Sequence, residues 1–564
     1  MNLKNIKSTI KGDLTGGLTA AIIALPMALA FGLQSGLGPQ AGLYTAIFLA
    51  LIASIIAGTK TLISDPTGPM TIVAATIIAA AGFTDDPSKS LPLIILSFAL
   101  AGVFQIIFGL IKVAQYVKYI SYPVLSGFMG GIGVIIILFQ WHKFFGDIRP
   151  KNHEKAVIDI ITDFHNPIME LNWSSIILGC STLAFIYLIP FISKKIPAGL
   201  LALIIGTLIS LALEPGTFEI IGEIPNQLPK ILHFNIPGQN EEIVISFSNL
   251  IGLSMSEIST AIVSGLTLAG LGTIDTLLTS VVADNLTKTK HNGNRELIGQ
   301  GMGNFIAAFF GGMPGAGSTT GTVANINSNG RSNISGIFKA IVLIIVVLGL
   351  GQYLKSVPIP VLSALLISVG IGIIDFKGIK RLIKIKNSDT LVLILVIVLT
   401  VFADLLVAVG VGMVLSSFFF MQRMGKIVDE QSKQGNISDM ERKLKIPESI
   451  KDRIFEYELD GPLFYGFSDQ FKEQAEAIKG KDAVIINMSS VPYIDASGIY
   501  VLEEVIQNFK TKNIEVVLVG VKDHIFKEFE ELKVIPKTLP EEKAYNSVRS
   551  GLKYLKFQLE NPDA

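Results

Sequence analysis

Apolar segments, several of them long enough to cross a membrane and others distinctly short, constrain the fold of this chain more than any other feature. They fall in two sets of seven, near residues 15–33, 40–58, 68–83, 92–113, 119–141, 173–193 and 196–213, then 259–281, 297–311, 318–328, 334–352, 358–375, 388–405 and 406–422. Several exceed the roughly 20 residues that a transmembrane helix needs. Only 16% of the chain is charged, against roughly 25% in soluble proteins. We therefore expect a polytopic α-helical membrane protein with fourteen spans, seven in each set.

The charge pattern changes near Gln422 and divides the chain into two parts. Charges are confined to short loops before this residue and are spread throughout the sequence after it. We expect a transmembrane transport domain over 1–425, a polar linker over 426–450 and a soluble domain over 451–558. In the soluble part, Ile454–Leu459, Asp482–Met488 and Ile514–Gly520 alternate with helical segments, which predicts a small α/β domain.

The distribution of lysine and arginine predicts the orientation of the spans. With an even number of spans both termini lie on one side, and most basic loop residues fall there, among them Lys60, Lys288 and Arg331. The opposite side receives fewer, among them Lys89 and Lys143. Because cytoplasmic loops carry the excess of basic residues, we expect both termini and the soluble domain to be cytoplasmic, on a protein of the plasma membrane.

Asp275 is an acid inside the long apolar segment Ala261–Val282. A charged side chain at this depth costs about 2.5–3.5 kcal/mol on insertion scales, so it usually faces a cavity and has a function. Thr279 follows one helical turn later on the same helix face. The alternative interpretation is that Asp275 only forms a structural hydrogen bond to a neighbouring helix.

Two segments in corresponding positions of the two sets are too rich in Gly, Pro and hydroxyl groups to be good helices. They are Asp65–Thr71 in the first set and Gly315–Thr322 in the second. Paired interruptions of this kind indicate the binding site of an inverted-repeat transporter, and an odd number of spans per set inverts the two repeats. Each interruption would expose a helix N-terminus, which attracts an anion. The alternative is that the small residues only let helices pack closely.

Oxygen atoms near these interruptions predict two ion sites. Thr67 and Ser318 would donate hydrogen bonds to a small anion without help from Arg or Lys, since neither segment contains one. A hard cation prefers oxygen ligands, and the second set of candidates supplies them from Asp275, Thr279, Thr319 and the carbonyl of Gly317. This cation would be sodium, or a proton would neutralise the acid instead. In symport each ion would then offset the charge of the other.

Other polar residues have predicted structural roles. Gln34, Gln300 and Asn304 are expected to form hydrogen bonds between helices, and Asp13 is expected to cap the first helix. The single cysteine, Cys180, lies in an apolar segment and excludes a disulfide framework or a cysteine-based metal site.

Several functional classes are excluded or disfavoured. A net charge of zero gives no sign of nucleic-acid binding. No G-x-x-x-x-G-K-[ST] loop occurs, which argues against an ATP-driven pump. No nucleophile and base set marks the membrane part as an enzyme. We expect no cofactor other than the coupling ion.

Segments along nearly the whole chain resemble the sulfate permease family of anion transporters. They are Gly12–Gly36, Ile63–Thr71, Ile274–Asn285, Gly299–Asn304 and Gly315–Ile326. The sequence DASG at 495–498 resembles the STAS domain that this family shares with anti-sigma-factor antagonists. Asp495 or Ser497 in this motif caps the following helix, and the alternative role for Ser497 is a regulatory phosphorylation site. Within the family, the chain looks most like the cyanobacterial sodium-dependent bicarbonate transporters.

The resemblance implies core and gate subdomains, elevator-type alternating access and a homodimer formed largely through the STAS domain. The residues that it implies for sodium are Asp275, Thr279, Gly317 and Thr319, and those for bicarbonate are Thr67 and Ser318. Alanine is expected at the position of Ser318, so this chain adds a hydroxyl there. Animal exchangers of the family often place arginine in the second interrupted segment. Its absence here, with Asp275 present, favours a cation-coupled symporter.

We therefore expect sodium-coupled uptake of bicarbonate across the plasma membrane. The first rival is a proton-coupled sulfate or dicarboxylate symporter with Asp275 as the proton carrier. The second is a membrane-anchored signalling scaffold whose tail binds a cytoplasmic regulator.

Overall fold

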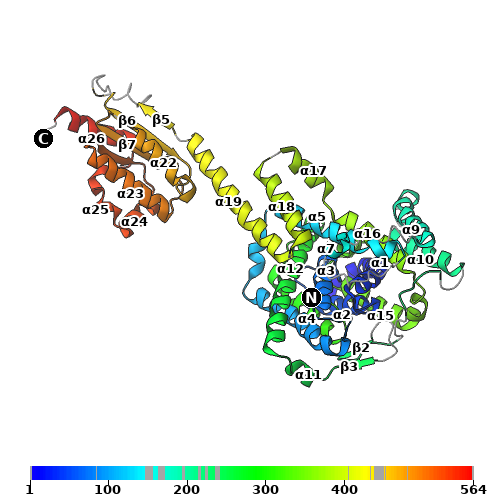
Figure 1. Cartoon of the computed structure of the whole chain (residues 1–564). Coiled ribbons are helices and arrows are strands. Elements are labelled where there is room, and N and C mark those ends of the chain that lie inside the picture. Colours follow the sequence, from blue (N-terminus) through cyan, green and yellow to red (C-terminus); the bar gives the residue numbers. More distant parts are fainter. Residues whose placement is uncertain are drawn as a thin grey trace. The chain divides into compact units, whose positions relative to one another are not determined.

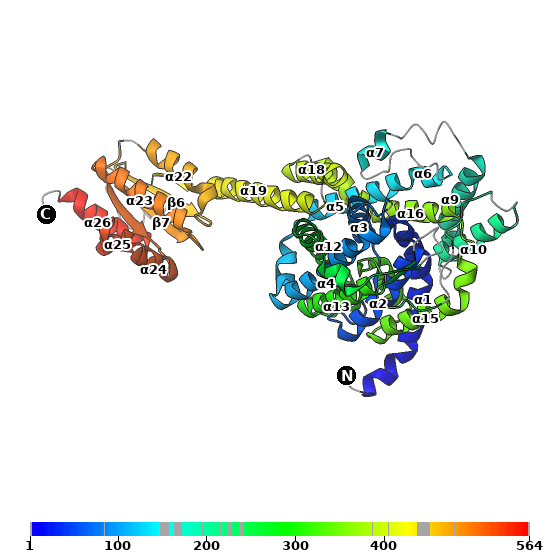
Figure 2. The ribbon, with the colours of Figure 1, turned by 60° about the horizontal axis from the view of Figure 1, so that its bottom comes forward.

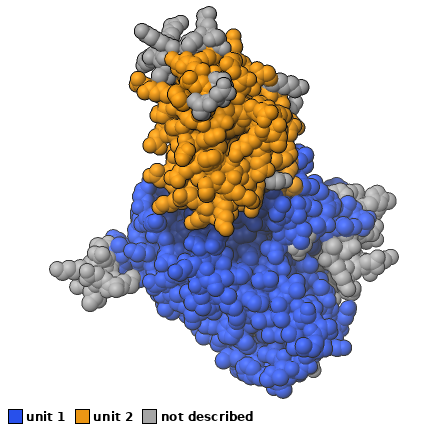
Figure 3. Space-filling model, turned by 90° about the vertical axis from the view of Figure 1, so that its left-hand side faces the viewer, with its two compact units in different colours: residues 1–414 blue, residues 415–564 orange. Residues whose placement is uncertain are grey.

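The chain forms two compact units, Met1–Val414 and Leu415–Ala564, which Figure 3 colours separately. The computed structural model describes residues 3–83, 85–146, 157–162, 172–193, 197–213, 217–222, 227–235, 242–385, 387–403, 405–431, 433–436, 450, 452–478 and 480–561. The boundary between the units falls inside one helix, α19 (Leu405–Gln431).

The first unit is almost entirely helical (Figures 1 and 2). Its first half contains α1 (Leu3–Ser35), α2 (Pro39–Ile56), β1 (Ser64–Asp65), α3 (Gly68–Ala80), α4 (Pro87–Leu110), η1 (Val113–Tyr119), α5 (Tyr122–Phe139), α6 (Trp141–Phe144), α7 (Val157–Thr162), α9 (Trp173–Ile192), α10 (Ala198–Leu211), β2 (His233–Asn235), β3 (Glu242–Val244) and α11 (Phe247–Ile251). Its second half contains α12 (Met255–Thr287), α13 (Gly293–Phe309), β4 (Ala316–Gly317), α14 (Thr319–Asn327), α15 (Ile334–Leu354), α16 (Ile359–Ile373), α17 (Phe376–Ile385), α18 (Ser388–Phe402) and the start of α19.

The predicted class of a polytopic helical membrane protein is confirmed. Among the described residues, nine helices are long and apolar enough to cross a membrane, and α3, α10 and α18 are apolar but shorter. The number of fourteen spans and the inverted repeat stay predictions.

The two interrupted segments meet in space as a short two-stranded sheet. β1 and β4 pair antiparallel, with Ser64 opposite Gly317 and Asp65 opposite Ala316. Each strand leads directly into a short helix, β1 into α3 and β4 into α14. Two helices therefore begin on either side of one strand crossing, within a bundle of longer helices.

The second unit is a small α/β domain. Its elements are the end of α19, β5 (Lys433–Asn436), β6 (Ile454–Asp460), α22 (Tyr465–Ala477), β7 (Ala483–Ser490), α23 (Ala496–Thr511), β8 (Glu515–Val519), α24 (Asp523–Glu531), α25 (Val534–Lys537), η2 (Glu541–Lys543), β9 (Ala544–Tyr545) and α26 (Val548–Glu560). The sheet order is β5-β6-β7-β8-β9, with β5 antiparallel and the other neighbours parallel. Of the predicted linker 426–450, residues 432 and 437–449 lie outside the described residues.

Both faces of this sheet are covered, which explains its continuous apolar strands. Side chains of β7 alternate between the two faces, as strand geometry requires. Val484 and Ile486 pack with α22, α23 and α24 on one face. Ala483 and Ile485 pack with Leu552 of α26 on the other. The alternation of strand and helix segments along the sequence therefore predicted the α/β class of this domain correctly.

Glu456 of β6 gives this domain a pH-dependent stability. Burial is the main cause that raises the pKa of its carboxyl, the neighbouring Glu458 raises the pKa further, and the hydrogen bond from Asn487 opposes both. A pKa raised by folding adds stability below the unfolded pKa, and this stability is lost as the pH rises through the folded pKa. The ionised form of Glu456 thus destabilises the fold at neutral pH.

We expect Glu456→Gln to raise the melting temperature of the protein at pH 7 and to have little effect near pH 4. Glutamine can still accept the hydrogen bond from Asn487 Nδ2, which is 3.1 Å from Glu456 Oε1 in the native domain. Thermal unfolding of variant and native protein at both pH values measures the difference. Equal melting temperatures at pH 7 would contradict the prediction, and Glu530→Gln, at an exposed position of α24, is the matched control.

Candidate functional site

The first helix start of the site is at Thr67 and Gly68. Pro69 in the first turn of α3 fixes a helical φ, and Thr67 is the N-cap with an extended backbone. Its hydroxyl does not cap the helix but donates to Asp275 Oδ2 at 2.7 Å. Gly68 lies close to α5, because an added Cβ would be 2.6 Å from Ile136 Cδ1 and would force that side chain to shift. The start of α3 is therefore held closely between α12 and α5.

The second helix start, at Ser318, is fastened to the first by backbone contacts. Ser318 N donates to the carbonyl of Ile63 at 2.7 Å, and Ser318 Oγ accepts from Gly321 N at 3.2 Å as the N-cap of α14. At Gly315 an added Cβ would lie 2.5 Å from the carbonyl oxygen of Asp65, so glycine is needed for the strands to cross. Both helices thus present their first-turn N–H groups, which lack intrahelical partners, near one crossing.

Helix α12 supports this crossing with two threonines. Thr276 Oγ1 accepts from Gly317 N at 3.1 Å, and Thr279 Oγ1 donates to the carbonyl of Gly317 at 2.9 Å. Thr279 Oγ1 also lies 2.8 Å from Thr319 Oγ1. Thr276 and Thr279 are fully buried, whereas Thr319 is exposed. The oxygen cluster is thus buried on one side and accessible on the other.

The predicted site residues form two neighbouring groups rather than one closed shell. Thr67 contacts Asp275, while Thr279 contacts Gly317 and Thr319. Among the described residues, Thr67 supplies the hydrogen bond of the Asp275 carboxylate. The two groups lie one turn apart on α12, because Thr279 follows Asp275 by four residues, or about 6 Å along the helix axis. This arrangement offers carboxylate, hydroxyl and carbonyl oxygens for a hard cation beside two helix N-termini for an anion.

Lys339 is a residue of this region that the sequence-based prediction does not include. It lies on α15, fully buried, and its ammonium forms an ion pair with Asp65 Oδ1. It also donates to the carbonyl of Ser64 at 2.8 Å and to that of Ala46 at 3.1 Å. A lysine in the middle of the apolar segment 334–352 was the sequence signal for it. Lys339 therefore holds β1 in place directly behind the strand crossing.

Two buried amides of α13 also hold the crossing. Asn304 Nδ2 donates to the carbonyl of Gly315 at 3.0 Å and to Gln105 Oε1 at 2.7 Å, and Gln300 Nε2 donates to Ser64 Oγ at 2.6 Å. The predicted interhelical hydrogen bond is confirmed for Asn304, whose partner Gln105 lies on α4. Gln300 instead bonds the strand β1 and Glu296 of its own helix. The same prediction for Gln34 is wrong, because neither polar atom of its amide has a partner among the described residues.

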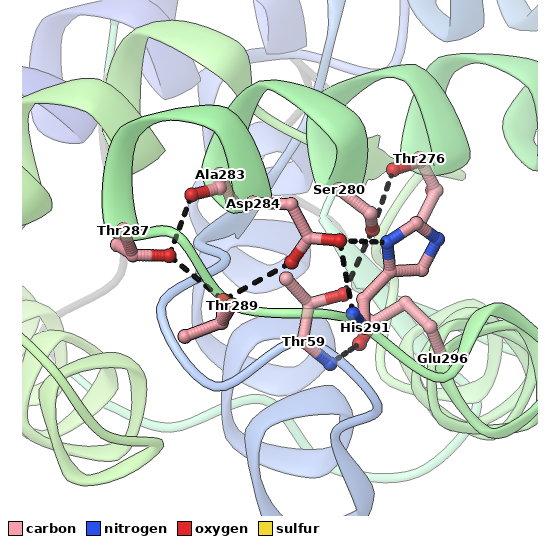
Figure 4. Close-up of polar contacts among 9 residues, drawn as sticks. All are labelled: Thr59, Thr276, Ser280, Ala283, Asp284, Thr287, Thr289, His291 and Glu296. Carbon is pink, nitrogen blue, oxygen red and sulfur yellow. Dashed lines mark hydrogen bonds and ion pairs between the residues drawn. The ribbon is translucent and has the colours of Figure 1, made fainter.

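A second polar cluster lies at the turn between α12 and α13 (Figure 4). His291 Nδ1 is 2.7 Å from Asp284 Oδ2, and Thr289 Oγ1 donates to the other oxygen of this carboxylate at 3.1 Å. Glu296 Oε2 accepts from Thr59 N at 2.7 Å, which ties α13 to the turn that follows α2. These contacts fix helix ends and shape the scaffold that carries α12.

The prediction that Asp13 caps a helix is wrong, and of the two predicted caps of α23 the first, Asp495, is confirmed. α1 begins at Leu3, so Asp13 lies inside the helix and accepts from the backbone N–H groups of Arg331 and Ser332 at 2.7 and 2.8 Å. In the second unit, the cap of α23 is Asp495, which accepts from Gly498 N at 2.8 Å, and not Ser497. A regulatory role of Ser497 stays a prediction.

Models of a protein family and of a protein domain match the sequence of this chain. The model of the sulfate permease family matches residues 10–396, and that of the STAS domain matches residues 445–550. The bicarbonate transporter BicA of Synechocystis sp. is 36% identical over 88% of this chain and 85% of its own.

Solved structures that resemble the chain include a close and a distant relative. The transmembrane domain of a cyanobacterium bicarbonate transporter BicA is 39% identical, covers 72% of this chain and 97% of its own, and has a TM-score of 0.63. The structure of SLC26A9 is 19% identical, covers 99% of this chain and 92% of its own, and has a TM-score of 0.80. At this identity the likeness concerns the fold alone.

Proposed function

Because this chain belongs to the sulfate permease family, we propose that it is a sodium-coupled bicarbonate symporter. The chain is an anion transporter with many membrane-type helices and a STAS domain, and it is not an enzyme. One contact carries the proposal of coupling. The hydroxyl of Thr67, a proposed bicarbonate ligand, donates to Asp275, a proposed sodium ligand.

This hydrogen bond suggests how the two ions depend on each other. A threonine hydroxyl has one hydrogen to donate, and that of Thr67 is engaged by Asp275. Sodium near Asp275 would neutralise the carboxylate and compete for its oxygens, so Thr67 could turn its hydrogen towards an anion. Without sodium, the negative carboxylate would both retain this hydrogen and repel the anion. Symport then follows from electrostatics, without an ATP site.

The remaining donors suit a small oxyanion. The N-termini of α3 and α14 supply partial positive charge at the crossing. The oxygen of Ser318 accepts from Gly321 N, which leaves the hydroxyl hydrogen of Ser318 for the anion. Helix dipoles and hydroxyls hold an anion without a permanent cation, because the ammonium of Lys339 is engaged by Asp65.

Elevator-type movement is the proposed means of alternating access. The ion ligands lie on α3, α12 and α14 and on the strand β4 between them, so they would move together as a core. Gly68 packs against Ile136 of α5 and Ile373 of α16, which would belong to the gate. We place both termini and the STAS domain in the cytoplasm, with dimerisation and binding of a regulator through the STAS domain, on a protein of the plasma membrane.

Uptake of labelled bicarbonate into proteoliposomes tests the proposed function. A sodium gradient is expected to drive accumulation, and its removal is expected to abolish accumulation. Uptake that persists without sodium and collapses with the pH gradient would instead establish the rival, a proton-coupled sulfate or dicarboxylate symporter. Transport without dependence on either gradient would contradict coupling through Asp275.

We expect Thr67→Val to reduce the affinity for bicarbonate roughly tenfold, since a hydrogen bond to a charged group contributes about 1.5–3 kcal/mol. Valine has nearly the shape of threonine but cannot donate to the anion. Thr67→Ser keeps the hydroxyl and is the matched control, with an expected affinity near that of the native protein. The KM for bicarbonate at saturating sodium measures the effect. Equal KM values for the valine and serine variants would exclude Thr67 as an anion ligand.

A further inference from the structure

A polar cavity separate from the strand crossing lies between the C-terminal end of α1, the second half of α3 and the α5–α6 segment. Its volume is about 210 Å³, and its lining includes Gln34, Thr76, Phe139 and Lys143. We call it the outer cavity, because the predicted orientation puts Lys143 and the end of α1 on the external side. Residues of α3 in its lining follow Thr67 by eight or more positions, which is at least about 12 Å of helix. The outer cavity is thus too far from Thr67 to be part of the same ion site.

Gln34 is the residue that marks the outer cavity as a binding site. Its side chain is only 8% exposed, yet neither Nε2 nor Oε1 has a hydrogen-bond partner among the described residues. Burying an amide without partners costs free energy, and buried polar groups are nearly always satisfied. An unpartnered buried amide that faces a cavity therefore points to a partner that binds there.

The charges around the cavity select an anion. Lys143 supplies a positive charge, and none of the described residues that line the cavity is acidic. The hydroxyl of Thr76 donates to the carbonyl of Ile72 at 3.1 Å in its own helix, so it offers an acceptor rather than a donor. Apolar walls such as Phe83 and Phe139 limit solvent access, which strengthens an interaction with the ammonium.

The amide of Gln34 matches one anion in particular. A carboxamide both donates and accepts a hydrogen bond. Bicarbonate offers the complementary pair, a charged oxygen that accepts from Nε2 and a hydroxyl that donates to Oε1. Sulfate has no hydrogen and leaves Oε1 without a partner, which is the kind of mismatch that polar sites reject strongly.

We propose that the outer cavity binds bicarbonate between Gln34 and Lys143 and supplies it to the inner site at Thr67. The inference rests on the proposed function for the identity of the anion. Because Lys143 and the inner site are separate, loss of the outer cavity raises the external bicarbonate concentration needed for uptake and leaves the sodium requirement and the maximal rate unchanged.

Thiol chemistry provides the sharpest test, since Cys180 is the single cysteine of the chain. In a Cys180→Ser background, Lys143→Cys carries one thiol that impermeant reagents reach from outside. We expect this variant to raise the KM for bicarbonate roughly tenfold, as for loss of a charged hydrogen bond. An aminoethyl reagent, which restores a positive charge, should return the KM towards the native value, and a sulfonatoethyl reagent should raise it further. Gln34→Leu should also raise the KM for bicarbonate.

Lys89→Cys in the same background is the matched control, because Lys89 is an exposed lysine on the same predicted side and does not line the cavity. Its KM should not respond to either reagent. Unchanged KM values in Lys143→Cys and Gln34→Leu, or the same response of Lys143→Cys to both reagents, would overturn the proposal.

The labelling rate separates this inference from the proposed function, because it does not depend on transport. At fixed pH, external bicarbonate should slow modification of Lys143→Cys roughly fivefold, and sulfate should not. Absence of protection by bicarbonate overturns the outer site whatever the transport result. Protection in a protein without sodium-driven uptake would uphold the outer site and refute the symporter.

Discussion

Asp275→Asn is expected to abolish sodium-driven uptake while the protein remains folded. Asparagine keeps the size of the side chain and an oxygen that accepts from Thr67, which donates at 2.7 Å in the native protein. It removes the negative charge that would hold the cation, and oxygen-rich sites for hard cations depend on such charge. We expect sodium-dependent accumulation of bicarbonate to fall roughly 100-fold or more, read as the ratio of maximal rate to KM.

Asp284→Asn is the matched control for this experiment. Asp284 is on the same helix, α12, but its carboxylate is engaged by His291 and Thr289 at the far end (Figure 4). Its substitution should leave the sodium dependence intact. If Asp275→Asn retained sodium stimulation, the cation would be bound elsewhere and the coupling proposed for Thr67 would be wrong.

The second large effect is expected for Lys339→Met, which should destabilise the transmembrane unit by about 3–5 kcal/mol. The substitution leaves Asp65 buried without its ion-pair partner, and the carbonyls of Ser64 and Ala46 lose their donor. The apparent melting temperature of the purified protein in detergent measures the loss. Because β1 is then no longer held behind the strand crossing, we also expect the variant to lose transport at a lower temperature than the native protein, near its own melting temperature.

A double variant distinguishes this mechanism from simple loss of packing. Asp65→Asn with Lys339→Met removes both charges, and replacing a whole buried pair is far less costly than breaking it. We expect the double variant to be more stable than Lys339→Met alone. Lys355→Met, at the exposed C-terminal end of the same helix α15, controls for the substitution itself. A double variant that is less stable than both single variants would contradict this account.

The paired charges explain why the acid at 275 dominates the electrostatics of the site. Asp65 and Lys339 neutralise each other in the buried layer behind the crossing. Asp275 has a hydroxyl as its hydrogen-bond partner instead of a cation. A bound cation is the natural partner for this charge, and the helix N-termini then favour an anion beside it.

Much of the architecture could be predicted because its signals are local. Membrane-length apolar segments gave the helical class, and the alternation of short apolar strands with helices gave the α/β domain. Interruptions rich in Gly and hydroxyl groups located the starts of α3 and α14 within a few residues, since Thr67 and Ser318 are their N-caps. Asp13 was misassigned because a carboxylate near an apolar segment has the same local signature whether it caps its own helix or a distant turn.

The sequence by itself therefore determined the presence of a separate soluble domain and of the features that cost free energy in a membrane, which are an acid in an apolar segment and two broken helices. The tertiary structure alone decided their partners. It joined Thr67 to Asp275 across 208 positions and Lys339 to Asp65 across 274 positions, and it left the amide of Gln34 at a cavity without a hydrogen-bond partner in the described part of the chain. The physical reason is that the free-energy cost of burying a polar group is a property of the residue and its segment, whereas its compensation depends on which distant backbone and side-chain atoms the packed fold brings within hydrogen-bond distance.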